Sequence, residues 1–325
     1  MKIPHYQELK QHTGSALSVA REAKKTILFY TGILTGMSLL VSILTMVLDN
    51  QISGAGGLSG MASRSILSTI RSVLPIAQSV ILMCLEMGYI SAAMRFARKQ
   101  HADPAHLKTG FRLFAPTLRL TLLQALIFSA ILLAVTNLVT RLYLLTPFAE
   151  PLLEATAPLL DSAAADDLFS PDLFLPMLPV LAMIVAVFAL VAVPLVYRYR
   201  MASYRLVDHP WEGARAALRN SRHMMRGNCL RLFRLDLHFW WYYLLSLLAS
   251  LICYGDQLLP LAGIELPISE TAAYFLFYAI YLVIQFFLFY CFRNRLEVTY
   301  VTAYDSIRPQ ESDNSVVLGS IFDMA

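Results

Sequence analysis

Apolar runs of about 20 residues recur along this chain, and they constrain its fold more than any other feature. Each run is long enough to cross a hydrocarbon layer of ~30 Å as a helix that rises about 1.5 Å per residue. Of the 325 residues, 57% are hydrophobic and only 15% are charged, whereas soluble domains carry about 25% charged residues. The sequence therefore predicts an all-α polytopic membrane protein with about six transmembrane helices, at residues 26–48, 73–94, 118–145, 173–199, 237–254 and 271–292.

The basic residues predict an orientation for these spans, because cytoplasmic loops retain Lys and Arg. All Lys and Arg residues except Arg64, Arg71 and Arg141 lie before the first span, after the last one, or in the loops on that same side. The segment 146–172 on the other side has acidic residues and no basic one. We therefore expect both termini in the cytoplasm. The expected organisation is an amphipathic cytoplasmic segment (1–25), a single six-helix transmembrane domain (26–292) and a cytoplasmic tail (293–325).

The segments on the predicted cytoplasmic side resemble one another. Asp103-Pro104 and His209-Pro210 each open a stretch of helical character, and Pro suits the first turn of a helix. The segment before the first span is a weaker version of the same pattern. The chain can thus be read as three repeated units, each a basic amphipathic helix at the membrane interface followed by a transmembrane hairpin.

Two short motifs resemble a known family. Residues 217–228 follow the pattern Ala-Leu-x-x-Ser-x-x-x-Met-x-Gly, and residues 233–240 follow Phe-x-Leu-x-x-x-x-Trp. This order is similar to that of the bacterial "domain of unknown function 975" membrane proteins, as are Arg21-Glu22-Ala23 and the Tyr-rich stretch 300–304. The chain departs from the family pattern in its longer loop around residues 255–270 and in lacking a Pro-Tyr exit from the last span. The resemblance covers most of the chain, and it implies a bacterial cell membrane and no known reaction.

A looser resemblance is to the membrane domain that accompanies some glycerophosphodiester phosphodiesterases, although the chain has no phosphodiesterase domain.

Glu86 is the most unusual residue within the apolar runs. It lies nine residues before Arg95, hence about 13 Å from the inner end of its span. An acid at the helix centre costs about 2.5–3.5 kcal/mol, so Glu86 should face protein or water, and we expect no Lys or Arg at its depth. Thr35, Gln124 and Gln285 lie at comparable depth and would form one polar layer with it. This layer is either a cavity for a proton or substrate, or a set of hydrogen bonds that join neighbouring helices.

Arg215, Arg219, Arg222 and Arg226 are spaced 4, 3 and 4 residues apart, which places them on one face of a helix. We expect this helix to lie parallel to the membrane. Its basic face could bind anionic lipid head groups, at ~1 kcal/mol per basic residue near the surface, or dock a cytoplasmic or membrane protein partner. It could equally reflect the ordinary excess of cytoplasmic basic residues. Nucleic acid is not expected, because the apolar side of the helix would already lie in the interface.

Other motifs favour structural roles. Gly32 and Gly36 form a GxxxG pattern, which predicts close helix packing within the bundle rather than homodimerisation. No CxxC pair occurs, and the spacing of His101, Asp103 and His106 matches no metal-ligand signature, so we expect neither a metal nor a cofactor. The aromatic residues of the last span favour lipid contact, or alternatively a lipid-binding groove.

The sequence therefore favours a non-enzymatic membrane protein that organises or senses the membrane through lipid or partner contacts. The alternative is a small permease with a polar cavity around Glu86. An intramembrane enzyme is disfavoured, because no nucleophile–base pair, metal motif or pair of acids lies at one membrane depth.

Overall fold

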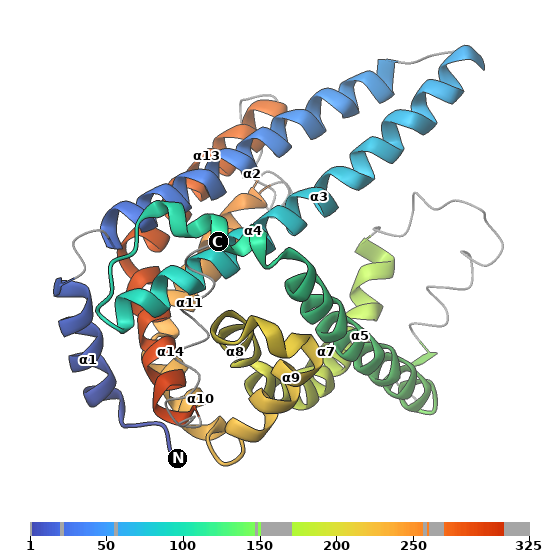
Figure 1. Cartoon of the computed structure of the whole chain (residues 1–325). Coiled ribbons are helices and arrows are strands. Elements are labelled where there is room, and N and C mark those ends of the chain that lie inside the picture. Colours follow the sequence, from blue (N-terminus) through green and yellow to red (C-terminus); the bar gives the residue numbers. More distant parts are fainter. Residues whose placement is uncertain are drawn as a thin grey trace. The chain divides into compact units, whose positions relative to one another are not determined.

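The fold is described by a computed structural model that covers residues 2–19, 23–54, 58–146, 149–150, 171–255, 259 and 270–308 (Figure 1). Every regular element in these ranges is a helix, and none is a strand. The all-α prediction is therefore confirmed. The longer helices are α1 (Tyr6–Val19), α2 (Ala23–Gly54), α3 (Leu58–Ala97), α5 (Phe114–Leu144), α7 (Pro171–Tyr199), α8 (Ala202–Asp208), α9 (Gly213–Met224), α10 (Cys229–His238), α11 (Trp240–Cys253), α13 (Glu270–Leu288) and α14 (Asn294–Ile307).

Five helical stretches are long and apolar enough to cross a membrane. They cover residues 23–52, 64–97, 114–144, 177–208 and 272–307. A sixth is obtained if α10 and α11, which meet at a bend of 65°, are counted as one span. Each predicted run thus has a counterpart, and the fifth is the one that is broken. Large apolar side chains such as Leu126, Leu133 and Leu190 are exposed on these helices, as lipid-facing residues would be.

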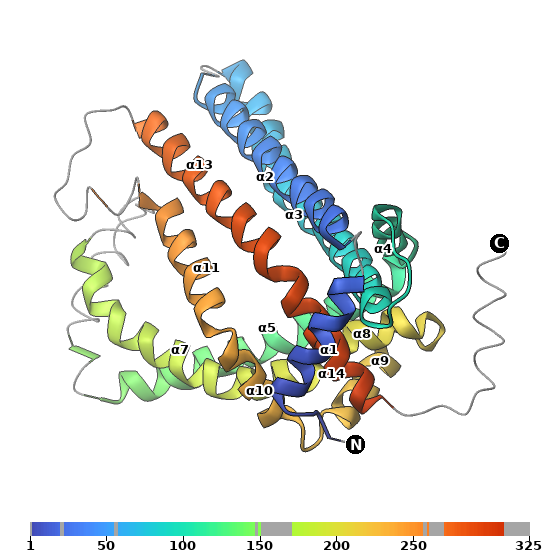
Figure 2. The same cartoon turned by 90° about the vertical axis from the view of Figure 1, so that its left-hand side faces the viewer.

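The chain divides into two compact units, residues 1–118 with 201–325 and residues 119–200. In the first unit α2 packs along α3, and α11 packs along α13 (Figure 2). In the second unit Tyr143 of α5 and Val180 of α7 are buried together with Ala149. The prediction of one transmembrane domain over residues 26–292 stays a prediction.

The helix α14 lies at the core of the first unit. It continues α13 through one π-helical turn (Phe289–Arg293), so the stretch predicted as a tail begins with a helix. Leu296, Val298, Tyr300, Val301 and Tyr304 are all buried at 2% exposure or less. The Tyr-rich stretch that carries part of the family resemblance is thus a packing element. It contacts α1 and α3, which fixes both against the end of the last span.

The turn after α3 folds back onto that helix at two glycines. A Cβ atom added at Gly88 would lie 2.1 Å from the carbonyl oxygen of Leu107, and one at Gly110 would lie 1.8 Å from that of Cys84. Leu107 belongs to the short 3-10 helix η1 (Pro104–Lys108), and Gly110 to the one-turn helix α4 (Thr109–Arg112). Both contacts are with backbone atoms, which cannot give way as a flexible side chain can. Only glycine therefore fits at either position.

Three segments that follow the three hairpins meet in a group of charges, here called the exit cluster (Arg98, Asp208, Tyr304, Asp305 and Arg308). Arg98, directly after α3, pairs with Asp208 of α8 and with Asp305 of α14, both at 2.9 Å. The Tyr304 hydroxyl donates to Asp208 at 3.1 Å, and Arg308 lies 3.3 Å from the same carboxylate. The ends of the three predicted repeats thus contact one another, and the reading of the chain as three related units stays a prediction.

Candidate functional site

The acidic residues of α8, α10 and α14, and Glu212 just before α9, have partners inside the protein, whereas Glu8 of α1 is exposed. Besides the exit cluster, Glu297 accepts a hydrogen bond from the Tyr204 hydroxyl at 2.6 Å, and Asp236 accepts one from Tyr300. Glu212 pairs with Arg205 and accepts from Asn220 at 2.8 Å. Many basic side chains around these elements are exposed instead: Lys10, Lys99, Lys108, Arg112, Arg215, Arg219, Arg222, Arg226, Arg234 and Arg295. We call this surface the basic end of the first unit.

Glu212 illustrates how firmly an acid is held at this end. Burial on its own would raise the pKa of its carboxyl group. The hydrogen bond and charge of Arg205, together with the amide of Asn220, outweigh burial, so the pKa of Glu212 lies below its usual value. The carboxylate is therefore ionised and neutralised within the protein, and it offsets little of the positive charge of the exposed arginines.

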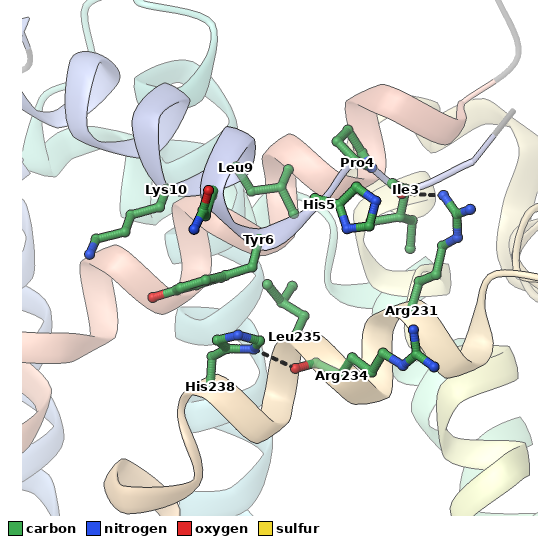
Figure 3. Close-up of a pocket in the computed structure, with 11 residues that line it drawn as sticks. Ile3, Pro4, His5, Tyr6, Leu9, Lys10, Arg231, Arg234, Leu235 and His238 are labelled. Carbon is green, nitrogen blue, oxygen red and sulfur yellow. Dashed lines mark hydrogen bonds between the residues drawn. The ribbon is translucent and has the colours of Figure 1, made fainter.

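A pocket of about 590 Å³ opens at the basic end, between α10 on one side and the N-terminal segment with α1 on the other (Figure 3). The basic side chains that line it are His5, Lys10, Arg231, Arg234 and His238. Ile3, Leu9 and Leu235 supply its apolar surface. None of the described residues that line the pocket is acidic. The pocket is therefore a concave site with a strong excess of positive charge.

Helix periodicity explains why α10 presents its basic residues together. Arg231, Arg234 and His238 are spaced three and four residues apart and share one face, as Figure 3 shows. Leu232 and Leu235 are buried, at 0% and 3% exposure, and they anchor the helix to the protein. The apolar contacts thus fix the direction in which the basic side chains point.

Hydrogen bonds and a ring contact hold the N-terminal segment over α10. The backbone N–H of Ile3 donates to Asn228 Oδ1 at 3.2 Å, and the guanidinium of Arg231 donates to the Ile3 carbonyl oxygen at 2.7 Å. Three residues after Ile3, the ring of Tyr6 stacks on His238 with centroids 4.1 Å apart. His238 Nδ1 lies 2.7 Å from the Arg234 carbonyl oxygen and must donate to it, since that oxygen can only accept. The pocket is therefore a formed feature of the fold.

Two of its cations are available to a ligand. The Lys10 ammonium and the Arg234 guanidinium make no hydrogen bond or ion pair in the described part of the chain, and both side chains are exposed. Guanidinium groups bind phosphate oxygens through paired N–H donors, and an ammonium adds a point charge. The arrangement suits a phosphate-bearing anion whose apolar part lies against Ile3, Leu9 and Leu235.

The predicted arginine face is present in part. Arg215, Arg219 and Arg222 are exposed on α9, whereas Arg226 follows the end of this helix at Met224, so the helix is shorter than predicted. The opposite face of α9, which includes Ala217, Leu218 and Ser221, is buried against the protein and contacts α8. The expectation that this apolar side lies in the membrane interface was therefore wrong, because the protein itself covers it.

Glu86 has a charged partner, contrary to expectation. Arg293 lies 3.2 Å from the Glu86 carboxylate and 3.7 Å from that of Glu297. Arg293 follows the last apolar run in sequence, but the α13–α14 helix is continuous there and brings it level with Glu86. The depth estimate for Glu86 was also misleading, because the part of α3 between Gly88 and Phe96 is largely buried within the protein. The end of α3 therefore does not mark the edge of the apolar surface.

The other members of the predicted polar layer have separate surroundings. Gln285 donates to the Ser246 hydroxyl of α11 at 3.1 Å, and Thr35 is half-buried on α2. Gln124 belongs to the second unit, so its position relative to Glu86 is not described. A shared layer of these residues stays a prediction.

Gly32 and Gly36 are exposed, and a Cβ atom added to either would meet nothing within 4 Å. A packing role for this GxxxG pattern therefore also stays a prediction. Among the described residues, no group of three or more His, Cys, Asp or Glu side chains is placed to hold a metal ion. His101 pairs with Asp103 at 3.2 Å on the exposed turn after α3.

Sequence reasoning missed the pocket between α1 and α10. The sequence does contain one indication of this pocket, the spacing of Arg231, Arg234 and His238, which resembles the spacing of the arginines on α9. The contribution of Lys10 and of the Ile3 carbonyl could not be found in this way, because they lie more than 200 residues away along the chain.

Comparison with known proteins gives one result. A family model described as "Protein of unknown function (DUF975)" matches residues 4–309. No curated protein and no solved structure matches the chain. The looser resemblance to the membrane domain of glycerophosphodiester phosphodiesterases is not confirmed. The family match includes the described residues that line the α1–α10 pocket except Ile3, together with the basic helix α9 and the buried helix α14, and the chain therefore belongs to the DUF975 family.

Proposed function

We propose that this chain is a non-enzymatic, multi-pass protein of the bacterial cell membrane that binds phosphate-bearing anionic lipid head groups at its cytoplasmic side. The observation that carries this proposal is the α1–α10 pocket, which gathers five basic side chains and, among its described lining residues, no acidic one. Anionic phospholipids are the phosphate-bearing groups that such a surface meets at the inner leaflet.

The position of α10 supports a lipid rather than a dissolved phosphate compound. Only Phe239 separates α10 from α11, which begins with Trp240 and Trp241. Trp240 is 59% exposed, and Trp residues gather at the level of lipid head groups. The pocket therefore lies beside the start of a candidate span, where a head group can enter while its acyl chains stay among the apolar helices.

The surface around the pocket supports the same orientation. The excess of Lys and Arg predicts that the basic end is the cytoplasmic side, by the rule that orients membrane proteins. The exposed arginines of α9 add attraction of ~1 kcal/mol per residue for an anionic surface. In this account α9 draws the protein to anionic lipid in general, and the α1–α10 pocket holds an individual head group. Such contacts would allow the protein to organise or sense the membrane around it.

The permease alternative rests on a cavity around Glu86. Glu86 pairs with Arg293 and is not among the described residues that line the α1–α10 pocket. In the described part of the chain, no observation favours transport over lipid binding.

Lipid binding can be measured on the full-length protein in detergent by native mass spectrometry. We expect phosphatidylglycerol to bind more tightly than phosphatidylcholine with the same acyl chains. The double variant K10Q/R234Q removes the two cations that have no partner among the described residues, and it should weaken phosphatidylglycerol binding about thirtyfold, given ~1 kcal/mol per basic residue. The matched control K108Q/R112Q loses the same charge at two exposed positions outside the pocket.

The control should bind almost as the unmodified protein does. Equal binding of the two lipids, or equal weakening by the two double variants, would contradict a specific site at α1 and α10.

A further inference from the structure

A second pocket, of about 380 Å³, lies in the first unit where α2 and α3 face α11 and α13. It is lined largely by hydroxyl-bearing side chains, among them Ser42, Thr45, Ser250, Tyr274, Tyr278 and Tyr281. No charged residue is among the described residues that line it. Its chemistry is therefore different from that of the basic α1–α10 pocket.

The outer faces of the same helices are apolar. Leu40 and Leu44 of α2 and Ile280 and Val283 of α13 are exposed, as on helices that contact acyl chains. In such surroundings a serine, threonine or tyrosine hydroxyl that makes no hydrogen bond destabilises the protein. An acyl chain in the pocket would leave hydroxyls without partners. A polar occupant therefore fits the pocket better.

Hydrogen bonds within the pocket leave both acceptors and donors for a ligand. The Thr45 hydroxyl donates to the Val41 carbonyl oxygen at 2.8 Å, and that of Ser250 donates to Ser246 at 3.0 Å, so the oxygen atoms of Thr45 and Ser250 can still accept. The Tyr281 hydroxyl has no hydrogen-bond partner in the described part of the chain and can donate. Such a mixture matches a ligand whose own groups both donate and accept, as hydroxyls do.

Three tyrosine rings form one wall of the pocket along α13. The rings of Tyr274 and Tyr278 are parallel, with centroids 5.8 Å apart, and that of Tyr281 lies 6.0 Å from Tyr278. The Tyr274 hydroxyl is 3.1 Å from the Ser42 hydroxyl of α2, which ties this wall to the opposite helix. Aromatic faces beside hydroxyl groups offer an apolar surface and hydrogen bonds together. A sugar ring presents the matching combination of C–H faces and hydroxyl edges.

Two described residues of opposite charge near the pocket, Asp49 and Arg71, neutralise each other. Asp49 follows Thr45 by one turn of α2, and Arg71 precedes Gln78 by two turns of α3. Asp49 and Arg71 form an ion pair at 2.9 Å. Among the described residues, a charged head group would therefore find no unpaired opposite charge at this pocket, whereas an uncharged head group needs none.

From these observations we infer that the pocket binds an uncharged polyhydroxyl group, specifically a sugar, and that it binds this group as the head of a membrane lipid. The apolar outer faces of α2 and α13 would then contact the acyl chains. The inference does not depend on the anionic site, because it uses other helices and other side chains.

The test uses the full-length protein in phosphatidylcholine nanodiscs and native mass spectrometry. Three probes separate the sources of affinity: a monoglucosyl diacylglycerol, the diacylglycerol with the same chains, and methyl glucoside. We expect the glycolipid to bind at least about tenfold more tightly than either other probe, since several hydrogen bonds and the acyl contacts then act together. Tighter or equal binding of methyl glucoside would overturn the lipid part of the inference. Equal binding of diacylglycerol would overturn the sugar part.

Two variants localise the site. T45V/Y278F/Y281F removes three hydroxyls with little change of shape and should weaken glycolipid binding about tenfold. Y290F removes the hydroxyl of an exposed tyrosine that is not among the described pocket residues, and it should have no effect. Unchanged glycolipid binding by the triple variant, with an unchanged unfolding temperature, would refute the site. If the triple variant unfolds, Y281F alone gives the same test, because the Tyr281 hydroxyl has no partner in the described chain.

Discussion

The ion pairs of the exit cluster indicate that Arg98 contributes strongly to the stability of the first unit, because it joins α8 and α14. We consider the substitution Arg98→Met, which keeps an unbranched apolar stem and removes the charge and donors of the guanidinium. Arg98 is 27% exposed, and it pairs with Asp208 and Asp305, which are 9% and 24% exposed. Removing one partner of a buried ion pair costs about 3–5 kcal/mol, because the remaining charge is left in the protein without compensation.

The structure places the expected loss at the low end of that range. Asp208 and Asp305 would both retain Arg308, at 3.3 Å and 3.4 Å. Arg308 is 40% exposed, so its compensation is weaker than that of Arg98. We therefore expect R98M to lower the free energy of unfolding by about 3 kcal/mol.

The matched control is Arg71→Met. Arg71 pairs with Asp49 at the same distance of 2.9 Å, but their side chains are 53% and 43% exposed. Exposed ion pairs contribute about 0–1 kcal/mol. Denaturant unfolding of the full-length protein in detergent should therefore show a large loss for R98M and little change for R71M. Equal losses in the two variants would refute the claim that the hairpin exits meet in a buried cluster.

Three further results are expected. Gly110→Ala should lower the unfolding temperature strongly, since overpacking against backbone atoms costs about 1–3 kcal/mol or more. Gly32→Ala should leave the unfolding temperature unchanged, because the added Cβ atom would meet nothing within 4 Å, and similar melting curves for the two variants would contradict the close approach of α3 and α4. Folding lowers the pKa of Glu212, so the stability that its ionised carboxylate contributes is complete above the pKa of this group in the unfolded chain and is lost as the pH falls through its pKa in the folded chain. Between about pH 6 and pH 3 the unfolding temperature should therefore fall less steeply in E212Q than in the unmodified protein, and parallel curves would contradict this. A cysteine at the exposed position Arg222, in a Cys-free background, should resist a membrane-impermeant thiol reagent in intact cells and react after lysis, and labelling in intact cells would reverse the orientation.

The helices were predictable because each apolar run must satisfy its backbone within itself. The bend of 65° between α10 and α11 was not predicted, since the apolar run continues through it in the sequence. The stretch after the last run also misled the prediction. Tyr300 and Tyr304 look like residues of a polar tail, yet both are buried. Their hydroxyls can be buried because they donate hydrogen bonds to Asp236 and Asp208. Those partners are far away in sequence.

The candidate site, like the fold, could be predicted from the sequence only in part. The basic spacing of Arg231, Arg234 and His238 on α10 can be read from the sequence, as can that of the arginines on α9. Which of the two faces forms a pocket depends on the N-terminal segment, which Arg231 and Asn228 hold through the backbone of Ile3. Backbone contacts of this kind leave no mark on residue types. The ion pair of Glu86 was missed for a related reason, because Arg293 lies outside the apolar run that was used to judge depth.

The most direct test of lipid binding at the basic end is to map where an anionic lipid touches the protein. Full-length protein in nanodiscs would be irradiated with a phosphatidylglycerol that carries a photoreactive group on its head, and the adducts would be located by mass spectrometry of peptides. Our account predicts that adducts concentrate on residues 3–10 and 231–238, which line the α1–α10 pocket, and that excess unlabelled phosphatidylglycerol suppresses them. Adducts spread evenly over exposed basic segments such as 213–224, with no enrichment in the pocket, would contradict it.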